Sequence, residues 1–496
     1  MTTSGPSRAT ALGAAAVFGY CVLRWGLGGL GPNAADVLVQ ARQQVDPRWL
    51  PHDTAASVDV PYRLLFEVLA GPWLALLGVD GGARLVRLIL CIGAASALVL
   101  LLRQVRVHPL LWVAVVAVLG ASPGIGAGEW MLLAAEAKCA AWLSGLGGIA
   151  LGLSGRDRLA AVLLGLSVGL HALVGGGLGV GVGVALVLSG RWRRLRALPW
   201  ALLPAGPGLM AVGDHLSGGT TGLTAAEAAA AVETYVRGRM AHHVLPPRFA
   251  EGWLARIGLA GVGLTLLWRR GGPGRELAVV ALGTLPLALL GAVLWWLDAA
   301  AWLRFQWFRV PDLLLPLAGT LGISAVLSEW RGMRYLGGAL GLALFLVPTL
   351  MEARPMMFVS HIDGGMSPRV DPAHACVEAA VPPHQRVLAD PTDAMLTLRS
   401  ERARVVSFKQ APHADRDVHD WLQRLQEASG GMPLLGGLEG RTALQAGWRR
   451  MSWAERMAVA RRHHAAFILV RSDRIPDGVQ IRCEGAGRSL VSVRDG

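Results

Sequence analysis

Acidic, basic and imidazole side chains recur in the stretches that separate the apolar runs of this chain. A carboxylate can accept a proton from an attacking hydroxyl or amine. Arginine binds a phosphate through paired N–H groups and stabilises it as a leaving group, and histidine exchanges a proton near neutral pH. The candidates are Asp36 and Asp53 as the base, Arg239, His242, His243 and Arg309 for a phosphate, and Glu129, Glu136, His171 and Asp312 for other substrate contacts. These residue types predict group transfer from a phosphate-bearing donor.

A purely structural role is the alternative for each of these residues. Glu129 and Glu136 are predicted to lie two turns apart on the same face of the helix over residues 129–153. Glu136 or Asp312 can pair with a nearby arginine and simply hold a helix bundle together. Ionisable groups inside a membrane are costly, and by default they indicate function when they face a cavity. The convergence of acids, arginines and histidines therefore favours a site over separate ion pairs.

Adjacent His242 and His243 raise the question of a metal site. Neighbouring side chains point in different directions in a helix or a strand, so we expect that the two do not bind one ion. HxxxH, HExxH and CxxC spacings are absent from the sequence. No metal ligand set and no firm cofactor is predicted, and a divalent cation is the minor alternative.

The elements that position these residues are apolar runs long enough to cross a membrane. The 496-residue chain is 53% hydrophobic and 16% charged, whereas soluble domains carry roughly 25% charged residues. The runs predict an α-helical polytopic membrane protein with about eleven spans. They are residues 10–30, 85–102, 109–121, 129–153, 158–174, 175–189, 197–212, 253–268, 276–296, 310–328 and 333–350. The first run lacks a convincing cleavage site and is interpreted as a retained span.

Arginine clusters between the runs predict which loops share a side. The net charge of +13 is nearly all arginine, because Lys138 and Lys409 are the only lysines. The clusters are Arg8, Arg103/Arg106, Arg156/Arg158, Arg191–Arg196, Arg269/Arg270/Arg275 and Arg331/Arg334. The positive-inside rule places them in the cytoplasm and explains the charge without a nucleic-acid partner. We therefore expect a cytoplasmic N-terminus in a bacterial inner (plasma) membrane and an extracytoplasmic C-terminal domain.

One apolar segment decides whether the predicted spans place all basic loops on the same side of the membrane. Residues 61–79 contain Arg63, Glu67 and Pro72, and counting them as a span reverses the side of every later loop. An interfacial helix along the membrane keeps all basic loops on one side. The extracytoplasmic loops are then residues 31–84, 122–128, 213–252 and 297–309. All of the candidate site residues lie in these loops or near the outer ends of the spans.

The last third of the chain has a different pattern. We predict a transmembrane domain over residues 1–351 and a small soluble α/β domain over residues 352–496. Parallel strands are expected at 386–389, 404–408 and 466–470, with helices at 419–427 and 453–464. Cys376 and Cys483 flank this domain and can pair outside the cytoplasm. Three other cysteines, Cys21, Cys91 and Cys139, lie in apolar runs and are expected to pack as small hydrophobes.

Several motifs resemble the GT-C superfamily of polytopic glycosyltransferases, and most closely a bacterial branch of multi-span proteins with GT-C-like architecture. They are Pro32-Asn33-Ala34-Ala35-Asp36, Asp46-Pro47-Arg48, Pro61-Tyr62-Arg63, Gly78-Val79-Asp80, Glu129-Trp130, Glu136-Ala137-Lys138, Arg239-Met240-Ala241-His242-His243, Phe308-Arg309-Val310-Pro311-Asp312, Ser407-Phe408-Lys409 and Asp420-Trp421. The resemblance implies sugar transfer from a polyprenyl-phosphate-linked donor to an unknown acceptor at the outer face, beside membrane lipid. Asp36 is the first choice for the base and Asp53 the second.

Two other functions remain open from the sequence. A lipid or small-molecule transporter or flippase typically shows internal repeats and broken helices that meet at the bilayer midplane. A non-catalytic membrane scaffold predicts that the loop acids and the Arg239–His243 segment can be replaced without consequence. The chain shows no internal repeat, and its polar residues lie toward one surface. Both observations favour the transferase.

Overall fold

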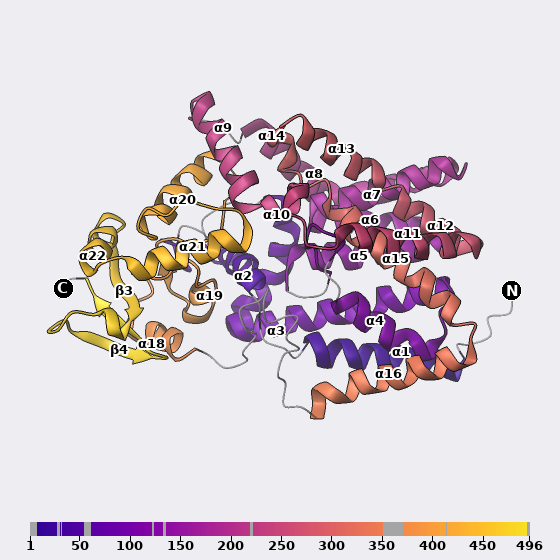
Figure 1. Cartoon of the computed structure of the whole chain (residues 1–496), viewed down its shortest axis with the longest axis horizontal. Coiled ribbons are helices and arrows are strands. Elements are labelled where there is room, and N and C mark those ends of the chain that lie inside the picture. Colours follow the sequence, from indigo (N-terminus) through magenta and orange to yellow (C-terminus); the bar gives the residue numbers. More distant parts are fainter. Residues whose placement is uncertain are drawn as a thin grey trace.

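The computed structural model describes residues 7–26, 30, 32–53, 61–121, 124–131, 135–218, 222–350, 371–412 and 414–493. The predicted domain boundary at 351/352 lies outside these residues. The described chain is mostly helical and carries one small sheet near its C-terminus. The coarse fold prediction, a helical membrane protein with a small C-terminal sheet, is therefore confirmed (Figure 1).

The helical part runs from α1 to α16. Its elements are α1 Arg8–Cys21, η1 Val22–Gly26, α2 Pro32–Val45, η2 Pro61–Arg63, α3 Leu64–Gln104, η3 Pro109–Leu111, α4 Trp112–Ala121, α5 Ala137–Leu153, α6 Asp157–Leu170, α7 Ala172–Leu188, η4 Trp192–Ala197, α8 Pro199–Gly218, α9 Ala225–Glu233, η5 Thr234–Arg239, α10 Ala241–Val244, η6 Pro246–Arg248, α11 Trp253–Arg269, α12 Gly272–Leu282, α13 Leu285–Trp296, α14 Ala300–Leu303, α15 Arg309–Leu327 and α16 Arg331–Leu350.

Several of these helices are apolar enough to cross a membrane. Four described segments, Arg8–Gly26, Leu64–Gln104, Gly272–Trp296 and Arg309–Leu327, are both long and apolar enough to span a bilayer. Pro109–Ala121, Ala137–Leu153 and Ala172–Leu188 are apolar but shorter. The chain is a multi-pass membrane protein. The number of eleven spans stays a prediction.

Helix α3 is broken where the sequence predicts the end of an interfacial helix. Gly78 has φ 72° and ψ 165°, a backbone conformation that side chains other than glycine rarely adopt. The break separates residues 64–77 from residues 79–104. The first part exposes apolar side chains such as Leu76, which is 75% exposed, and Leu69, which is 54% exposed. A separate amphipathic segment before the long helix agrees with an interfacial helix, and its position at the membrane surface stays a prediction.

The predicted cytoplasmic loops meet at one end of the helical part. Arg194, which follows α7, lies 3.6 Å from Asp157 at the start of α6. Arg191 pairs with Glu276 of α12, and Arg270 pairs with Glu329 at 2.7 Å. These contacts place the basic loops together, as the arginine clusters predict. Which side of the membrane this end faces stays a prediction.

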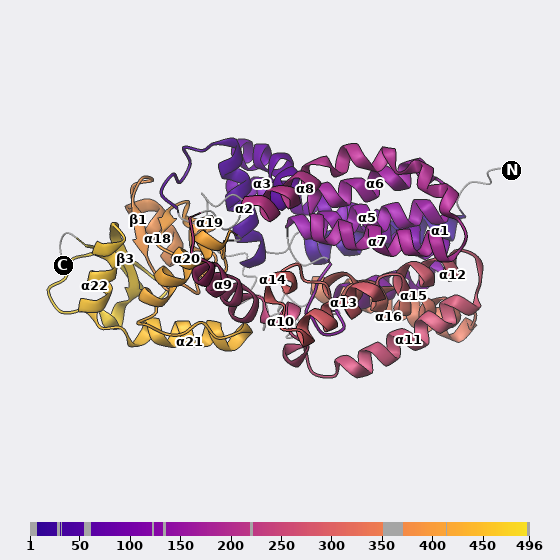
Figure 2. The ribbon, with the colours of Figure 1, turned by 90° about the horizontal axis from the view of Figure 1, so that it is seen from above.

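The C-terminal residues form a five-stranded sheet with helices around it (Figure 2). Its elements are α18 Pro372–Ala380, β1 Arg386–Leu388, α19 Leu396–Ser400, β2 Ala403–Arg404, α20 Asp415–Glu427, α21 Gly437–Arg450, α22 Trp453–Arg462, β3 Ala465–Arg471, η7 Ser472–Arg474, β4 Ile481–Gly485 and β5 Arg488–Ser492. The strand order is β2-β1-β3-β5-β4. Strands β2, β1 and β3 are parallel, as predicted, but β2 is only Ala403–Arg404 rather than 404–408, and the antiparallel hairpin β4–β5 was not predicted.

The sheet contacts the segment that follows α2. The Asp53 carboxylate is fully buried and accepts hydrogen bonds from the backbone N–H of Arg404 (3.0 Å) and the Thr397 hydroxyl (3.3 Å). Trp49 donates its indole N–H to Glu401 at 3.1 Å. Arg399 of α19 binds Asp80 of α3 at 2.6 and 2.8 Å. These contacts hold the C-terminal residues against α2 and α3.

A disulfide joins Cys376 of α18 to Cys483 of β4, with Cα atoms 5.9 Å apart and a sequence separation of 107. The sequence had left this pairing open. Cys21, Cys91 and Cys139 are free and buried, as expected for small hydrophobes. Disulfides persist in oxidising compartments, so the bond supports an extracytoplasmic position for this part of the chain.

Replacing both paired cysteines with serine is expected to destabilise the C-terminal sheet by about 3–5 kcal/mol, because the closed loop is long. Thermal unfolding followed by limited proteolysis of the C-terminal residues measures the change. Adding a reductant to the wild type should lower its midpoint to that of the Cys376→Ser/Cys483→Ser variant, and reductant should not affect the variant. An identical midpoint for oxidised and reduced wild-type protein would contradict this prediction.

Candidate active site

A cavity of about 450 Å³ opens where the helical part meets the C-terminal residues. Figures 1 and 2 show α2, α10 and α14 in this region, between the long helices and the sheet. Its charged and polar lining residues are Asn33, Asp36, Gln40, Tyr62, Arg63, Glu136, Lys138, His171, Tyr235, Arg239, His242, His243, Arg304, Gln306, Arg309, Lys409 and Gln410. Six of these side chains are cationic and two are carboxylates, so the lining favours an anionic ligand.

Asp36 is positioned by α2, whose other face packs into the apolar core through Leu38 and Ala41. Its Oδ1 atom is buried and has no hydrogen-bond partner among the described residues. Burial raises the pKa of Asp36 to about 6, although the cations Lys409, Arg404, Arg239 and Arg63 pull the pKa down. A carboxylate with a raised pKa and an unused oxygen can accept a proton from a bound nucleophile.

Arg239 and Lys409 bring two cations toward Asp36 from different parts of the chain. Arg239 ends the π-helical turn η5, donates to the Lys409 carbonyl at 3.3 Å and lies over the Phe408 ring at 5.2 Å. Its Nε atom is buried and lacks a hydrogen-bond partner among the described residues. Lys409 donates to the Asn33 side chain. Burial and repulsion from Arg239 lower the pKa of Lys409 to about 8.

Arg309, at the start of α15, is held in the cavity lining by a buried network. Its Nε atom lies 3.2 Å from Glu129, which is fully buried, and its Nη1 atom lies 3.5 Å from His171 Nε2. Lys138 Nζ lies 3.7 Å from Glu129 and 3.6 Å from Glu136. Glu129 does not line the cavity and orients two cations, whereas Glu136, Lys138, His171 and Arg309 line the cavity. The prediction that Glu129 and Glu136 share one helix face is wrong, because α5 begins only at Ala137.

The expectation that the His242 and His243 side chains point in different directions is wrong. Their ring centroids are 3.9 Å apart, and both rings line the cavity. Both residues belong to the single turn α10. His243 Nδ1 lies 2.5 Å from the Ala127 carbonyl, which fixes Nδ1 as the protonated nitrogen. Among the described residues, no three His, Cys, Asp or Glu side chains come together as metal ligands.

Both imidazoles are neutral. Burial lowers the pKa of His242 to about 3, with Arg239 and Lys409 adding repulsion, and burial also lowers the pKa of His243. A neutral imidazole beside a phosphate contributes an N–H donor but no positive charge. The cations of the cavity are therefore its arginines and lysines.

Two predicted site residues lie outside the cavity. Asp53 is buried against β2 and α19, as described above. Asp312 accepts hydrogen bonds from the backbone N–H groups of Gly126 (2.6 Å), Ala127 (2.8 Å) and Glu129 (3.2 Å). Its carboxylate therefore shapes the 124–129 loop, which positions Glu129 and the carbonyl that binds His243. Asp53 and Asp312 hold neighbouring segments in place and do not line the cavity.

Several cavity residues were not among the predicted site residues. Both lysines of the chain, Lys138 and Lys409, line the cavity, as do two of its four tyrosines, Tyr62 and Tyr235. The rarity of lysine could have pointed to these two residues, because the chain otherwise uses arginine for its basic residues and places both lysines at one site. Arg63 and Arg304 could not be recognised in this way, since arginines are frequent in the loops.

The comparisons with known proteins concern the fold. A family model described as "Domain of unknown function (DUF6798)" matches residues 371–428. A search of curated protein sequences finds no match. Among solved structures, the chain is similar to the Archaeoglobus fulgidus oligosaccharyltransferase tethered to an acceptor peptide, with 12% identity, 93% of this chain and 68% of that chain covered, and a TM-score of 0.45. It is also similar to ArnT from Cupriavidus metallidurans, with 13% identity, 98% and 97% covered, and a TM-score of 0.41.

At TM-scores of 0.45 and 0.41, neither likeness carries an argument about this chain. At these identities the likeness says nothing of substrates, so the function of this chain has to be argued from the side chains of its cavity.

Proposed function

We propose that this protein is a membrane glycosyltransferase that moves a sugar from a polyprenyl-phosphate donor to an acceptor at the extracytoplasmic face. The observation that carries the proposal is the composition of the cavity wall. One buried carboxylate, Asp36, has a free oxygen and faces a set of buried cations drawn from both halves of the chain. Such a wall combines a proton acceptor with a site for a leaving phosphate.

In the proposed reaction these residues accept the proton and stabilise the leaving phosphate. An acceptor hydroxyl or amine loses its proton to Asp36 and attacks the anomeric carbon of the sugar. The bond between that carbon and the phosphate oxygen breaks, and the oxygen keeps the electron pair. Arg239, Lys409 and Arg309, which all line the cavity, stabilise the new negative charge. His242, which is neutral, donates an N–H group to a phosphate oxygen.

Mass spectrometry of lipids that co-purify with the gently solubilised protein tests the donor site. Arg239→Gln is the test variant, because Arg239 lines the cavity and Asp36 keeps the neighbouring cations Lys409, Arg404 and Arg63 when Arg239 is lost. The wild type is expected to carry a polyprenyl phosphate or its sugar adduct, and the variant about tenfold less, the effect of losing one charge-assisted contact.

Arg237→Gln is the matched control for this experiment. Arg237 is two residues away on the same turn, but it pairs with Glu233 and Asp298 outside the cavity. We expect it to retain the lipid at the wild-type level. Finding only bulk phospholipid, in equal amounts on all three proteins, would overturn the donor assignment. Retention of the sugar lipid without any transfer by the wild type would favour a transporter instead.

A further inference from the structure

A second cavity, of about 940 Å³, lies among α5, α6, α7, α8, η4 and α12. Helix α7 connects the two cavities: it begins after His171, which lines the first, and ends just before Arg191, which lines the second. Its 17 residues span about 25 Å at 1.5 Å per residue. The two cavities share no lining residue, and the charged part of the second lies at the end of the helical part where the basic loops meet.

The interior of this cavity is apolar and is kept open by glycines. Gly179 and Gly183 are one turn apart on α7 and both line the cavity. A Cβ atom added at either position would meet no atom within 4 Å. By contrast, a Cβ on Gly165 of α6, also a lining residue, would lie 2.1 Å from the Ala201 carbonyl. Gly165 therefore allows two helices to pack closely, whereas the α7 pair leaves the space itself empty of side chains.

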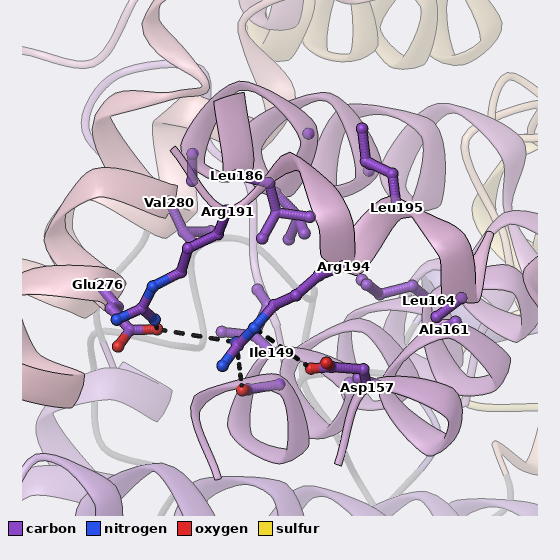
Figure 3. A pocket seen from close by; sticks show the side chains of 18 of the residues that line it. Ile149, Asp157, Ala161, Leu164, Leu186, Arg191, Arg194, Leu195, Glu276 and Val280 are labelled. Carbon is purple, nitrogen blue, oxygen red and sulfur yellow. Dashed lines mark hydrogen bonds and ion pairs between the residues drawn. The ribbon is translucent and has the colours of Figure 1, made fainter. Parts of the chain in front are cut away.

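Charged side chains gather at one part of the wall (Figure 3). Arg191 reaches Glu276, and Arg194 lies between Glu276 at 4.0 Å and Asp157 at 3.6 Å. Arg194 also donates to the Gly152 carbonyl at 3.0 Å. Three arginines and two carboxylates line the cavity in all, since Arg275 is the third. Two more arginines, Arg193 and Arg196, are exposed on the same turn η4, so the local charge is positive.

The arginines of these ion pairs can exchange their carboxylate partner for another anion. The side chains of Arg191 and Arg194 are 42% and 30% exposed, and those of Glu276 and Asp157 are 25% and 36% exposed. Partly exposed ion pairs contribute little to stability, typically about 0–1 kcal/mol. A phosphate, which accepts paired N–H groups from arginine, can therefore replace a carboxylate partner at small cost.

We propose that this cavity binds an anionic membrane phospholipid. Its phosphate occupies the Arg191 and Arg194 end, and an acyl chain lies along the Gly179–Gly183 face of α7. The exposed aromatic side chains beside the mouth, Trp192 and Trp200, are 57% and 53% exposed and suit a membrane–water interface. An apolar interior with a cationic rim matches both parts of such a lipid, whereas a free phosphate uses only the rim. The site is independent of the donor cavity and of the proposed sugar transfer.

Native mass spectrometry of the delipidated full-length protein with added lipid tests this inference. Dioleoyl phosphatidylglycerol is expected to bind the wild type at least about tenfold more tightly than dioleoyl phosphatidylcholine. Glycerophosphoglycerol, the same headgroup without acyl chains, is expected not to bind. Arg194→Gln should weaken phosphatidylglycerol about tenfold through the loss of its paired donors. Gly183→Leu should weaken both lipids by filling the space where a chain lies.

Matched variants distinguish the loss of this lipid site from a general loss of structure. Arg270→Gln removes another ion-paired arginine from the same end of the bundle, but one that does not line the cavity. Gly176→Leu adds a side chain on the same helix, also into open space, outside the cavity. Both should bind phosphatidylglycerol like the wild type. Leucine has the higher helix propensity, so neither glycine variant should unfold. Equal binding of the two lipids, or unchanged binding by both Arg194→Gln and Gly183→Leu, would overturn the inference.

Discussion

Replacing Asp36 with asparagine is expected to slow sugar transfer by about 10²–10⁴-fold, the usual contribution of a general base, while the donor still binds. The amide keeps the shape of the carboxylate but accepts no proton. Donor binding should persist because the cations of the cavity remain. Asp36 Oδ1 has no hydrogen-bond partner among the described residues, so the change leaves the local packing intact.

The measurement is the release of polyprenyl phosphate, followed by mass spectrometry. The substrates are the lipid-linked sugars extracted from the cells that make the protein, with their membrane extract as the acceptor source. Asp46→Asn is the matched control, since Asp46 follows the same helix but pairs with Arg42 at 3.2 Å outside the cavity. Its rate should equal that of the wild type. A normal rate for Asp36→Asn would show that another group takes the proton.

The pH profile provides an independent readout of the same residue. The pKa of Asp36 is raised to about 6, so the carboxylate becomes protonated, and unable to accept a proton, as the pH falls through that value. The wild-type rate should therefore decline about tenfold per pH unit below about 6. The residual rate of Asp36→Asn should lack this acid limb.

Replacing Lys409 with methionine is expected to slow transfer by about 10²–10³-fold, the cost of removing one preorganised group that stabilises developing charge. Methionine fills a similar volume without the charge. Because Lys409 comes from the loop after β2 and lies in a cavity formed mainly by the helical part, a large effect would also show that the C-terminal residues complete the active site. Rates measured as above, at saturating and limiting donor, separate chemistry from binding.

The charge of Lys409 predicts a second pH dependence of the transfer rate. Its pKa is lowered to about 8, so its positive charge is lost as the pH rises through that value, and the wild-type rate should fall on the alkaline side. Lys409→Arg keeps the charge to higher pH and should recover most of the rate while moving this limb upward. An unchanged alkaline limb in both Lys409 variants would place the titrating group elsewhere.

Local patterns in the sequence predicted the elements that depend on nearby residues. The parallel strands β1 and β3 were predicted because Val387 and Leu388, and Phe467 to Val470, are buried apolar runs. The hairpin β4–β5 was missed because Ile481–Gly485 is largely exposed and has no apolar run. Its position in the sheet depends on pairing with β3 through β5 and on the disulfide at Cys483.

The membrane class and the grouping of the basic loops were determined by the sequence alone, because hydropathy and charge are properties of short segments. Only the tertiary structure decided which ionisable residues line the cavity. Asp312 and Arg309 are three residues apart, yet one anchors a loop and the other lines the cavity. Lys409 joins Asp36 across more than 370 residues of chain. Such contacts depend on how distant elements pack, which no local pattern records.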